Sequence, residues 1–169
     1  MIRKARMGDV KEMQKLIDVY AKKGEMLPRS LLEIYENIRD YLVSTLDTGE
    51  IIGVCAMHIF WDGLAEVRSL AVKQDYTHKG IGTQLVKACI EEARGFEINQ
   101  VFSLTYKPGF FEKLGFRIVD KSLLPQKIWS DCLKCPQFPD CNEIALILEL
   151  NGCSADPASP CASPLFTAG

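Results

Sequence analysis

A glycine-rich stretch in the middle of the chain has the composition of a phosphate-binding loop. It reads Tyr76-Thr77-His78-Lys79-Gly80-Ile81-Gly82-Thr83 and lies between a β-rich run and an amphipathic segment. Glycines let backbone N–H groups approach a ligand closely, and the first turn of a helix adds unbonded N–H donors and a positive dipole end. The sequence therefore predicts that this loop binds a pyrophosphate. The same glycines would also fit a turn that only begins a helix, since short glycine motifs recur by chance.

Two familiar nucleotide-binding motifs do not fit this loop. Gly80-x-Gly82 lacks the third glycine of a dinucleotide fingerprint, and the apolar runs before it are joined by hairpin signals instead of forming a βαβ unit. No Lys-Ser or Lys-Thr pair closes a Walker A loop. These two ways of binding a nucleotide are therefore excluded.

Cysteines form a second unusual cluster near the C-terminal end. Cys132, Cys135 and Cys141 supply three thiolates, and Cys153, Asp140 or a histidine could complete a zinc site. The spacing has no second paired knuckle, and no histidine is close in the sequence. Reduced cysteines in an irregular loop are therefore the favoured interpretation, and a bound metal stays an open alternative.

Hydrophobic spacing and capping residues predict the elements around the loop. Asp9 caps a first helix with apolar positions at helical spacing, and Ser30 with Glu33 forms a capping box for a second. A third, amphipathic helix follows Gly80. In chain order, the predicted elements are strand 2–6, helices 10–23 and 31–39, strands 41–46, 51–61 and 64–72, helix 81–94, strand 101–104, helix 109–114, and strands 116–119 and 144–150.

The order β-α-α-β-β-β-α-β-α-β-β is typical of an α+β fold, a mostly antiparallel mixed sheet with helices on both sides. Residues 1–151 are assigned to one domain, because a chain of 169 residues suits a single core. Residues 152–169 are rich in Ser, Ala, Pro and Gly with little charge. We predict that they form a disordered tail or are a cloning remnant.

Composition limits the class of partner. A hydrophobic fraction of 47% and a charged fraction of 25% are ordinary, and a net charge of −2 argues against a surface for nucleic acid or anionic membrane. The N-terminus lacks the apolar run of a secretory signal, and no stretch is long and apolar enough to span a bilayer. We therefore predict a cytoplasmic protein with a small-molecule substrate and no nucleic-acid or membrane partner. The sequence leaves a homodimer open.

The whole arrangement resembles the GNAT superfamily of acetyl-CoA-dependent N-acetyltransferases. That family carries a phosphate signature, Arg/Gln-x-x-Gly-x-Gly/Ala, after a strand that ends in a run like Leu70-Ala71-Val72. Gly80 and Gly82 match the signature, and Thr77 stands in the Arg/Gln position. The resemblance implies acetyl-CoA as the cosubstrate, bound largely by backbone amides. The implied cofactor-binding residues are Leu70, Ala71, Val72, Thr77, His78, Lys79, Gly80, Ile81, Gly82 and Thr83.

A second segment extends the resemblance. Phe110-Phe111-Glu112-Lys113-Leu114-Gly115-Phe116 looks like the family's FYEKLGF segment, with Phe111 in place of a tyrosine. The likeness covers about residues 2–150 and implies the GNAT fold, with two strands that splay at Leu70 to Val72 and leave ladder groups for the acetyl carbonyl and the pantetheine arm.

Within the superfamily, the chain looks like the short, single-domain N-acetylglutamate synthases and the acetyltransferase domain of longer ones. This likeness implies acetyl transfer to the α-amino group of L-glutamate, the first step of arginine biosynthesis. Two alternatives stay open: a GNAT enzyme for another amino acid or small amine, and a catalytically silent acyl-CoA-binding or regulatory module. The segments that match are Met26–Ser30, Ala65–Val72, Val101–Thr105 and Leu124-Pro125.

Acetyl transfer to an amine needs a base for the ammonium group and a partner for the leaving thiolate. The resemblance implies Glu66 as the base, although a surface carboxylate on a half-exposed strand is the plainer alternative. Phe111 cannot donate a proton. The matching synthases place a hydroxyl at the end of the preceding strand, which implies Thr105, with Tyr106 as the fallback. Thr105 could equally be a structural strand-end residue.

An amino-acid substrate also needs cations for its carboxylates. Arg29 matches the carboxylate-binding arginine of the synthases, and a guanidinium suits a bidentate carboxylate. Arg68 shares a strand face with Glu66, so it could bind substrate or form a plain ion pair. The synthases' second arginine has no counterpart just before the last strand, and Lys107 or Lys127 could replace it. The candidate substrate-binding residues are Leu27, Arg29, Arg68, Ser69 and Lys107.

The two histidines are interpreted separately. His58 lies within an apolar strand and is assigned a structural role. His78 lies in the glycine-rich loop, where it could touch a CoA phosphate or be a solvated loop residue.

Overall fold

A mixed sheet runs through the part of the chain that the structure, a computed structural model, describes, which is residues 1–124 and 142–150. The strand order is β1-β2-β3-β4-β5-β7-β6. Neighbouring strands pair antiparallel except β4 and β5, which are parallel. This confirms the predicted α+β class with a mostly antiparallel sheet. The strands are β1 (Ile2–Lys4), β2 (Tyr41–Thr45), β3 (Ile51–Trp61), β4 (Leu64–Val72), β5 (Gln100–Thr105), β6 (Arg117–Val119) and β7 (Ile144–Glu149).

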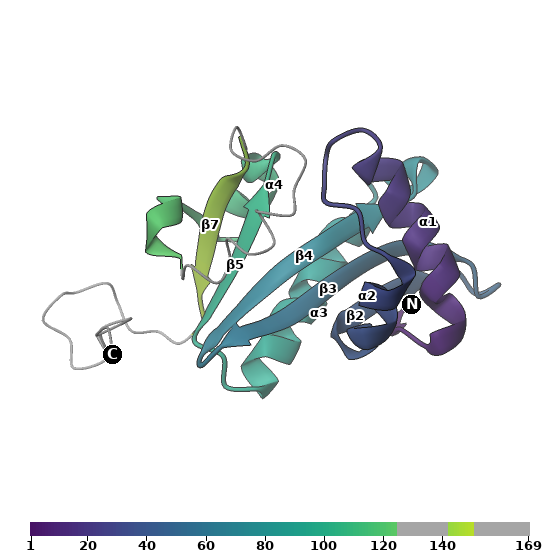
Figure 1. Ribbon diagram of the computed structural model, residues 1–169, viewed down its shortest axis with the longest axis horizontal. Helices are drawn as coiled ribbons and strands as arrows, with labels where there is room; N and C mark the ends of the chain where they lie inside the picture. Colours follow the sequence, from purple (N-terminus) through teal and green to yellow (C-terminus); the bar gives the residue numbers. More distant parts are fainter. Residues whose placement is uncertain (125–141, 151–169) are drawn as a thin grey trace, which may run out of the picture.

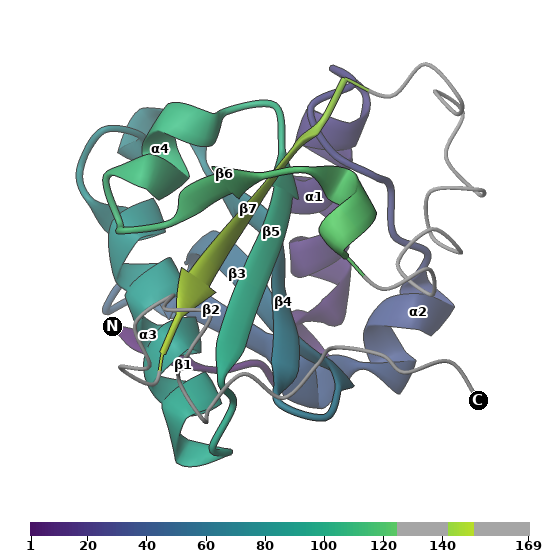
Figure 2. The ribbon, with the colours of Figure 1, turned by 90° about the vertical axis from the view of Figure 1, so that its left-hand side faces the viewer.

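Helices cover the two faces of this sheet. In Figure 2 the sheet separates α3 and α4 from α1 and α2. The alternation of side chains along the strands builds a core on each face. One core joins α1 and α2 to Tyr41, Val43, Val54 and Ala56, and the other joins α3 to Leu42, Cys55, Met57, Ala65 and Val67. Within the described residues, the helices are α1 (Val10–Ala21), α2 (Leu31–Glu36), α3 (Ile81–Gly95) and α4 (Pro108–Glu112), and the 3₁₀ turns are η1 (Met7–Asp9), η2 (Ile38–Asp40), η3 (Gln74–Tyr76) and η4 (Lys121–Leu123).

The amphipathic spacing of the helices matches their buried residues. In α1 the buried side chains are Val10, Met13, Leu16 and Ile17, and in α3 they are Leu85, Val86, Cys89, Ile90 and Ala93. Gly53 on β3 lets α3 lie close to the sheet, because a Cβ there would come within 2.9 Å of the Leu85 side chain. The apolar pattern of the sequence therefore fixes which face of each helix is buried.

The start of the first helix differs from the prediction that Asp9 caps it. The Asp9 carboxylate makes no capping bond to α1. It accepts hydrogen bonds from the Arg6 backbone N–H at 2.7 Å and from both terminal nitrogens of Arg3 at 2.6 and 3.0 Å. The hydrogen bond with Arg3 is the main reason why the pKa of Asp9 is lowered. The Asp9 carboxylate therefore bonds to the Arg3 guanidinium of β1 and not to the first turn of α1. The η1 turn precedes that helix.

The second helix is shorter than predicted at its C-terminal end. The capping box of Ser30 and Glu33 is present as expected. The α-helix ends at Glu36 instead of continuing to Arg39, because Asn37 leaves the helical conformation and its side chain donates to the Glu33 carbonyl at 2.8 Å. The η2 turn then connects α2 to β2.

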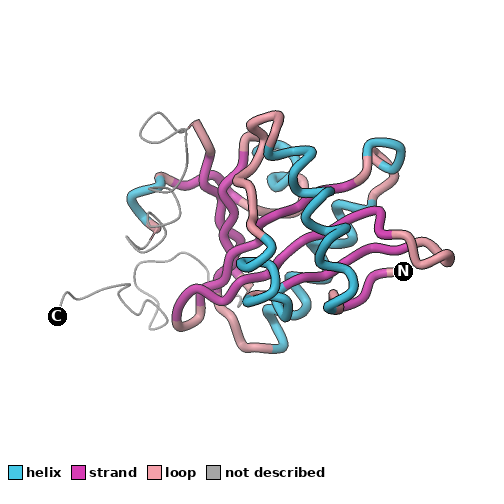
Figure 3. The backbone as a smooth tube through the Cα atoms, turned by 45° about the vertical axis from the view of Figure 1, so that its right-hand side comes forward, coloured by secondary structure: helices cyan, strands magenta, loops and turns pink. Residues whose placement is uncertain are grey.

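The sheet opens between its two parallel strands. The β4–β5 ladder contains only the pairs Leu64–Gln100, Ala65–Val101 and Glu66–Phe102. Figures 1 and 3 show the two strands together at one end of the sheet and apart at the other, where the group of β5, β7 and β6 turns away from the group of β1 to β4. The opening lies beside the predicted phosphate loop and matches the expected splay.

Candidate active site

The splay between β4 and β5 begins just after a hydrogen bond made by Ser103. The Ser103 hydroxyl donates to the Val67 carbonyl at 2.9 Å, just beyond the last ladder pair of β4 and β5. From that point the strands diverge, so the backbone of β4 from Arg68 to Val72 faces the opening. The N–H and C=O groups that such an edge leaves without a partner strand can pair with an extended ligand. The predicted residues Leu70, Ala71 and Val72 all lie on this edge.

A β-bulge shapes the same stretch of β4. The β3–β4 register shifts between Val54, which pairs with Ala71, and Ala56, which pairs with Arg68. Within the bulge, Ser69 has a φ of 54°, which a residue with a Cβ adopts rarely. Bulges beside active sites re-aim side chains. Here the Ser69 hydroxyl hydrogen-bonds with Tyr41 of β2, on the face that carries α1 and α2.

The glycine-rich loop forms a tight turn into α3. Gly80 is the residue before the helix and has a φ of 79°, and His78 has a φ of 59°. Gly80 is therefore the residue type that this turn requires. The first turn of α3, from Ile81 to Thr83, presents N–H groups that have no intrahelical acceptor, together with the positive end of the helix dipole. The loop thus has the geometry of an anion-binding nest.

The side chains of the glycine-rich loop contact the loop itself or point to solvent, whereas its backbone faces the proposed anion site. Thr77 donates its hydroxyl to the Gln74 carbonyl at 2.8 Å, so it braces the loop. The Lys79 ammonium lies 4.9 Å from the centroid of the Tyr76 ring, a cation–π contact. His78 and Lys79 are exposed. The backbone therefore provides the fixed donors, and the two cationic or polar side chains lie at the solvent edge.

Aromatic and backbone contacts join the loop to the end of β4. A Cβ on Gly82 would lie 3.6 Å from the Phe110 ring of α4 and 3.8 Å from a methyl group of Val72. The Tyr20 hydroxyl of α1 donates to the Val72 carbonyl at 2.5 Å. Gly82 thus leaves room at the first turn of α3, and Tyr20 holds the strand end in place. The sequence alone gave no sign of this role of Tyr20, because its apolar spacing assigns it to the helix core.

A polar cluster lies on the α1 and α2 face of β4. Glu66 and Arg68 alternate with Ala65 and Val67, whose side chains pack toward α3, so the two charged residues share the opposite face. An Arg68 terminal nitrogen lies 3.5 Å from a Glu66 carboxylate oxygen, and the side chains are only 11% and 12% exposed. The expected common face is confirmed, and the pair is a largely buried ion pair beside the splay.

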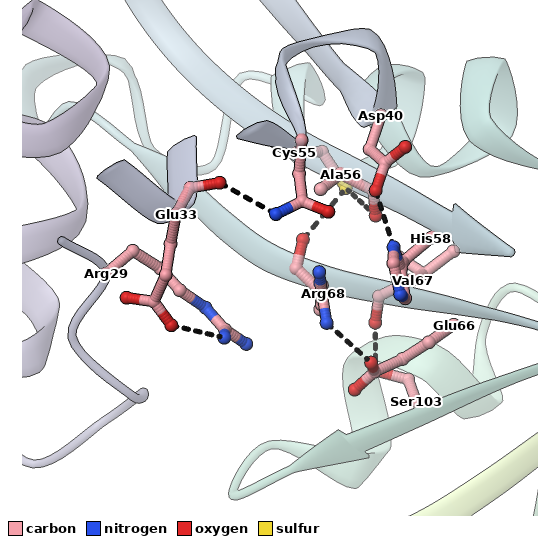
Figure 4. Close-up of polar contacts among 11 residues, drawn as sticks. Arg29, Glu33, Asp40, Cys55, Ala56, His58, Glu66, Val67, Arg68 and Ser103 are labelled. Atoms are coloured by element: carbon pink, nitrogen blue, oxygen red, sulfur yellow. Dashed lines mark hydrogen bonds and ion pairs between the residues drawn. The ribbon is translucent and has the colours of Figure 1, made fainter. Parts of the chain in front are cut away.

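Arg29 reaches the same face from the loop before α2. Its side chain is 11% exposed and lies 3.8 Å from the Glu33 carboxylate. Gln14 of α1 donates to the Arg29 carbonyl at 3.1 Å and so fixes the loop backbone. Figure 4 shows Arg29 and Arg68 approaching each other from the loop and from β4. Leu27, two residues earlier, is half-buried in the same loop.

Tyr41 is a member of this cluster that sequence reasoning missed. It is fully buried, and burial raises the pKa of its hydroxyl, while the positive charges of Arg29 and Arg68 and the hydrogen bond with Ser69 partly oppose that rise. The phenol therefore lies within electrostatic reach of both arginines. The available signal was a tyrosine at the start of an otherwise aliphatic strand, which propensity alone explains.

Asp40 and His58 form a second polar pair next to Glu66. The His58 Nδ1 lies 2.6 Å from an Asp40 carboxylate oxygen. His58 is also the register partner of Glu66 across the β3–β4 ladder, so both side chains project from the same face. Figure 4 draws the His58 ring between the Asp40 and Glu66 carboxylates. The sequence placed His58 on its strand but gave no sign that Asp40 would pair with it.

The other wall of the splay is the end of β5. The Thr105 hydroxyl accepts a hydrogen bond from the Lys107 backbone N–H at 3.0 Å, and Tyr106 between them is half-buried. The Lys107 ammonium forms an ion pair with Glu25 at 2.8 Å, although the two residues are 82 positions apart. This pair joins the loop after β5 to the loop after α1, across the open end of the splay.

Phe111 faces the core and not the opening. It is 4% exposed and packs edge-to-face on Phe110 and Phe116, with ring centroids 5.1 and 5.2 Å apart. The position therefore contributes packing in this chain.

Two further expectations concern metal and membrane. Among residues 1–124 and 142–150, no group of three or more potential ligands could hold a metal ion. Cys132, Cys135 and Cys141 lie outside the described residues, so their cluster stays a prediction. In the same described ranges, every helix is too short or too polar to cross a bilayer.

The combination of a splayed β4 edge, an anion nest at α3 and a match to known sequences decides the family. Residues 10–116 match the sequence profile of the Acetyltransferase (GNAT) family. The chain belongs to that family. An uncharacterized N-acetyltransferase of Chlorobaculum tepidum is 40% identical over 149 residues, which cover 88% of this chain and 96% of the relative. An amino-acid acetyltransferase of Mycobacterium tuberculosis is 30% identical over 133 residues, which cover 78% of this chain and 76% of the relative.

A solved structure shares the fold. The N-acetylglutamate synthase of Neisseria gonorrhoeae, complexed with coenzyme A and N-acetyl-glutamate, superposes with a TM-score of 0.81 at 26% identity. The match covers 89% of this chain and 35% of that protein, so the present chain spans about a third of its length. The GNAT fold, the acetyl-CoA cosubstrate and the acyltransferase class of this enzyme follow from these likenesses. The loop fits such a cosubstrate, since Gly82 leaves the space at α3 that a Cβ would begin to fill.

Proposed function

We propose that this GNAT acetyltransferase transfers the acetyl group of acetyl-CoA to the α-amino group of L-glutamate, the first step of arginine biosynthesis. The observation that carries the proposal is the largely buried Glu66–Arg68 pair beside the splayed edge, with Arg29 on the same face. A carboxylate and two guanidinium groups match an amino acid, which brings one ammonium and at least one carboxylate. The synthase and amino-acid acetyltransferase names of the similar proteins support the same substrate class.

The cosubstrate is assigned to the opening between β4 and β5. Backbone groups of Leu70 to Val72 pair with the pantetheine arm and the acetyl carbonyl. The N–H groups of the loop and of the first turn of α3 bind the pyrophosphate, and Lys79 adds a positive charge at the solvent edge. A backbone hydrogen bond to the acetyl carbonyl polarises it and stabilises the charge that develops on its oxygen.

Glu66 is assigned as the base that removes a proton from the substrate ammonium. Only the charged form of a carboxylate accepts a proton, and the guanidinium of Arg68 favours that form. The neutral amine then attacks the thioester carbon. General-base help of this kind contributes about 10²- to 10⁴-fold in rate.

Thr105 is assigned as the partner of the leaving thiolate. The Lys107 N–H occupies an acceptor site of its hydroxyl oxygen, so the hydroxyl hydrogen remains available for another acceptor. Donation to the sulfur would stabilise the charge that develops as the C–S bond breaks. Tyr106, the next residue, is the alternative donor.

Arg29 is assigned to a substrate carboxylate, and its fixed loop backbone supports this role. Leu27, Arg68 and Ser69 complete the binding surface for the amino acid. Lys107 is the candidate for the second carboxylate of glutamate. It forms an ion pair with Glu25, so this role requires Lys107 to exchange that carboxylate for the substrate's.

Release of CoA from acetyl-CoA across a panel of amino acids and amines tests the proposal. We expect the highest kcat/KM with L-glutamate. Faster turnover of a neutral amine or of another amino acid would instead identify a GNAT enzyme with that substrate. Tight CoA binding without turnover of any amine would favour the silent acyl-CoA-binding module, which the buried Phe111 makes a specific alternative.

A further inference from the structure

We propose that His58, oriented by Asp40, is the group through which Glu66 returns the substrate proton to solvent. The role rests on the proposed function, because it requires Glu66 to act as the base. It assigns a task to a histidine that the sequence pattern explained as a structural residue of an apolar strand.

The stoichiometry of the reaction requires a route by which a proton leaves the site. The nitrogen enters as an ammonium with three protons, the N–C bond forms, and the C–S bond breaks with its electron pair on sulfur. The amide keeps one proton and the thiol takes one, so one proton leaves the site in each turnover. A base that retained this proton could not act again. Glu66 is only 12% exposed, so direct exchange with bulk water is restricted.

His58 lies where that proton could go next. It is directly opposite Glu66 in the antiparallel ladder, and the Cβ atoms of such a pair are about 5 Å apart. Its side chain is 28% exposed, so it reaches solvent from a position across the ladder from Glu66. An imidazole changes its charge near neutral pH, which lets it take a proton from a carboxylic acid and release it to water at the same pH.

Asp40 determines which nitrogen of His58 is available. An ionised carboxylate only accepts hydrogen bonds, so the Nδ1 atom 2.6 Å from Asp40 must carry the proton. The Nε2 atom then holds the free electron pair and is the proton acceptor. The arrangement resembles a base with its orienting carboxylate, which η2 and β3 bring together.

The other groups around His58 are compatible with this role. The charged or titratable neighbours on its face are Asp40 of η2, Tyr41 of β2, and Glu66 and Arg68 of β4. The Phe60 ring packs edge-on to the imidazole with centroids 6.2 Å apart. Two carboxylates, Asp40 and Glu66, and one guanidinium, Arg68, therefore lie on the same face as the imidazole.

A purely structural hydrogen bond is the competing explanation, and the chain contains a matched example of one. Asp9 of η1 anchors its turn to Arg3 of β1 as Asp40 of η2 anchors its turn to His58 of β3. Asp9 is remote from the splay and has no place in the catalytic assignment. Asp9→Asn is therefore the control for Asp40→Asn.

The tautomer provides a test that does not depend on turnover. We expect the ¹⁵N NMR shifts of His58 in the wild-type protein, at a pH where the ring is neutral, to show the Nδ1–H form. Asp40→Asn should shift that population toward Nε2–H, and Asp9→Asn should leave it unchanged. A wild-type ring that is mainly Nε2–H would overturn the proposal.

Kinetics provide the second test. We expect His58→Ala to lower kcat about 10- to 100-fold, with the KM of both substrates changed less than about twofold, and to make kcat rise with the concentration of added imidazole. Asp40→Asn should have a smaller effect with an altered pH profile of kcat. If the kcat of the His58→Ala enzyme does not depend on imidazole and keeps the wild-type pH profile, His58 is only a structural residue.

The two proposals fail in different ways. If the wild-type enzyme acetylates no amine, the proposed function itself fails. If the wild-type enzyme acetylates an amine and these readouts do not change in the variants, only the role of His58 fails.

Discussion

The proposed cofactor side and the proposed substrate side of the site are built from different parts of the polypeptide. On the cofactor side, the β4 edge and the first turn of α3 present backbone groups, and Gly80 adopts a positive φ to form the turn. On the substrate side, the atoms to which we assign a function belong to side chains: Glu66 and Arg68 from β4, Arg29 from a loop, and the Asp40–His58 pair from η2 and β3.

This difference determines what each side tolerates. Backbone donors depend on the conformation of the chain, so most side chains of the loop can vary as long as the glycines keep the turn open. A site built from buried, paired side chains is more sensitive to substitution, because removal of one partner leaves the charge or polar group of the other buried and uncompensated. Substitutions on the substrate side should therefore cost more than substitutions of non-glycine residues on the cofactor side.

The largest effect is expected for Glu66→Gln. The amide has nearly the shape of the carboxylate but cannot accept the ammonium proton, so kcat should fall by about 10²- to 10⁴-fold. Steady-state kinetics and calorimetric titration with CoA would separate the chemical step from binding, which should be unchanged. Glu12→Gln is the matched control, since Glu12 is an exposed carboxylate paired with Lys15 on α1. Kinetics like those of the wild type would remove Glu66 from the mechanism.

Arg29→Ala should come next. A hydrogen bond to a charged group is worth about 1.5–3 kcal/mol, so loss of the guanidinium should raise the KM for the amino acid by about 10- to 100-fold. The KM for acetyl-CoA should stay within about twofold of the wild-type value. An effect on acetyl-CoA alone would move Arg29 from the substrate side to the cofactor side.

Gly82→Val should give an intermediate effect on the cofactor side. A Cβ at Gly82 would only touch the Phe110 ring and Val72, at 3.6 and 3.8 Å, so Gly82→Ala should be nearly silent. The two extra methyl groups of valine overfill this space and should raise the KM for acetyl-CoA about tenfold, because overpacking costs about 1–3 kcal/mol. Gly95→Val, at the far end of the same helix with nothing within 4 Å of its Cβ, is the control. Equal KM values for the two valine variants would contradict this account of Gly82.

Sequence patterns predicted the elements of the cofactor side better than the side-chain contacts of the substrate side, for the same physical reason. Local hydrophobic spacing and two glycines were enough to place α3 and its preceding turn, because both depend on residues adjacent in the chain. The contacts of Tyr41 with Ser69 and of Asp40 with His58 depend on how β2, β3 and β4 align. No local pattern encodes that alignment.

Contacts between residues on different strands also explain why predictions from local sequence patterns were wrong at some positions. Asp9 has the residue type and position of a helix cap, yet Arg3 on the adjacent strand takes its carboxylate. The bulge at Ser69 changes which side chains share a face, and it becomes visible only once β3 and β4 are paired. Features fixed by pairing across the sheet are therefore beyond the reach of a pattern in a single sequence.

The smallest effect, and the sharpest test of the contrast between the two sides, is expected for Thr77→Ala. Thr77 stands where the family signature has Arg or Gln, and its hydroxyl bonds to the Gln74 carbonyl at 2.8 Å within its own loop. Loss of a neutral hydrogen bond at this partly exposed position should cost about 1 kcal/mol or less, so the KM for acetyl-CoA should rise less than about fivefold. Thr77→Arg, measured beside it, would add a cation to the loop without removing any backbone donor. A much larger rise in KM for Thr77→Ala would mean that the side chain, and not the backbone, dominates pyrophosphate binding. Side chains would then dominate binding on both sides of the site, and the contrast between them would be wrong.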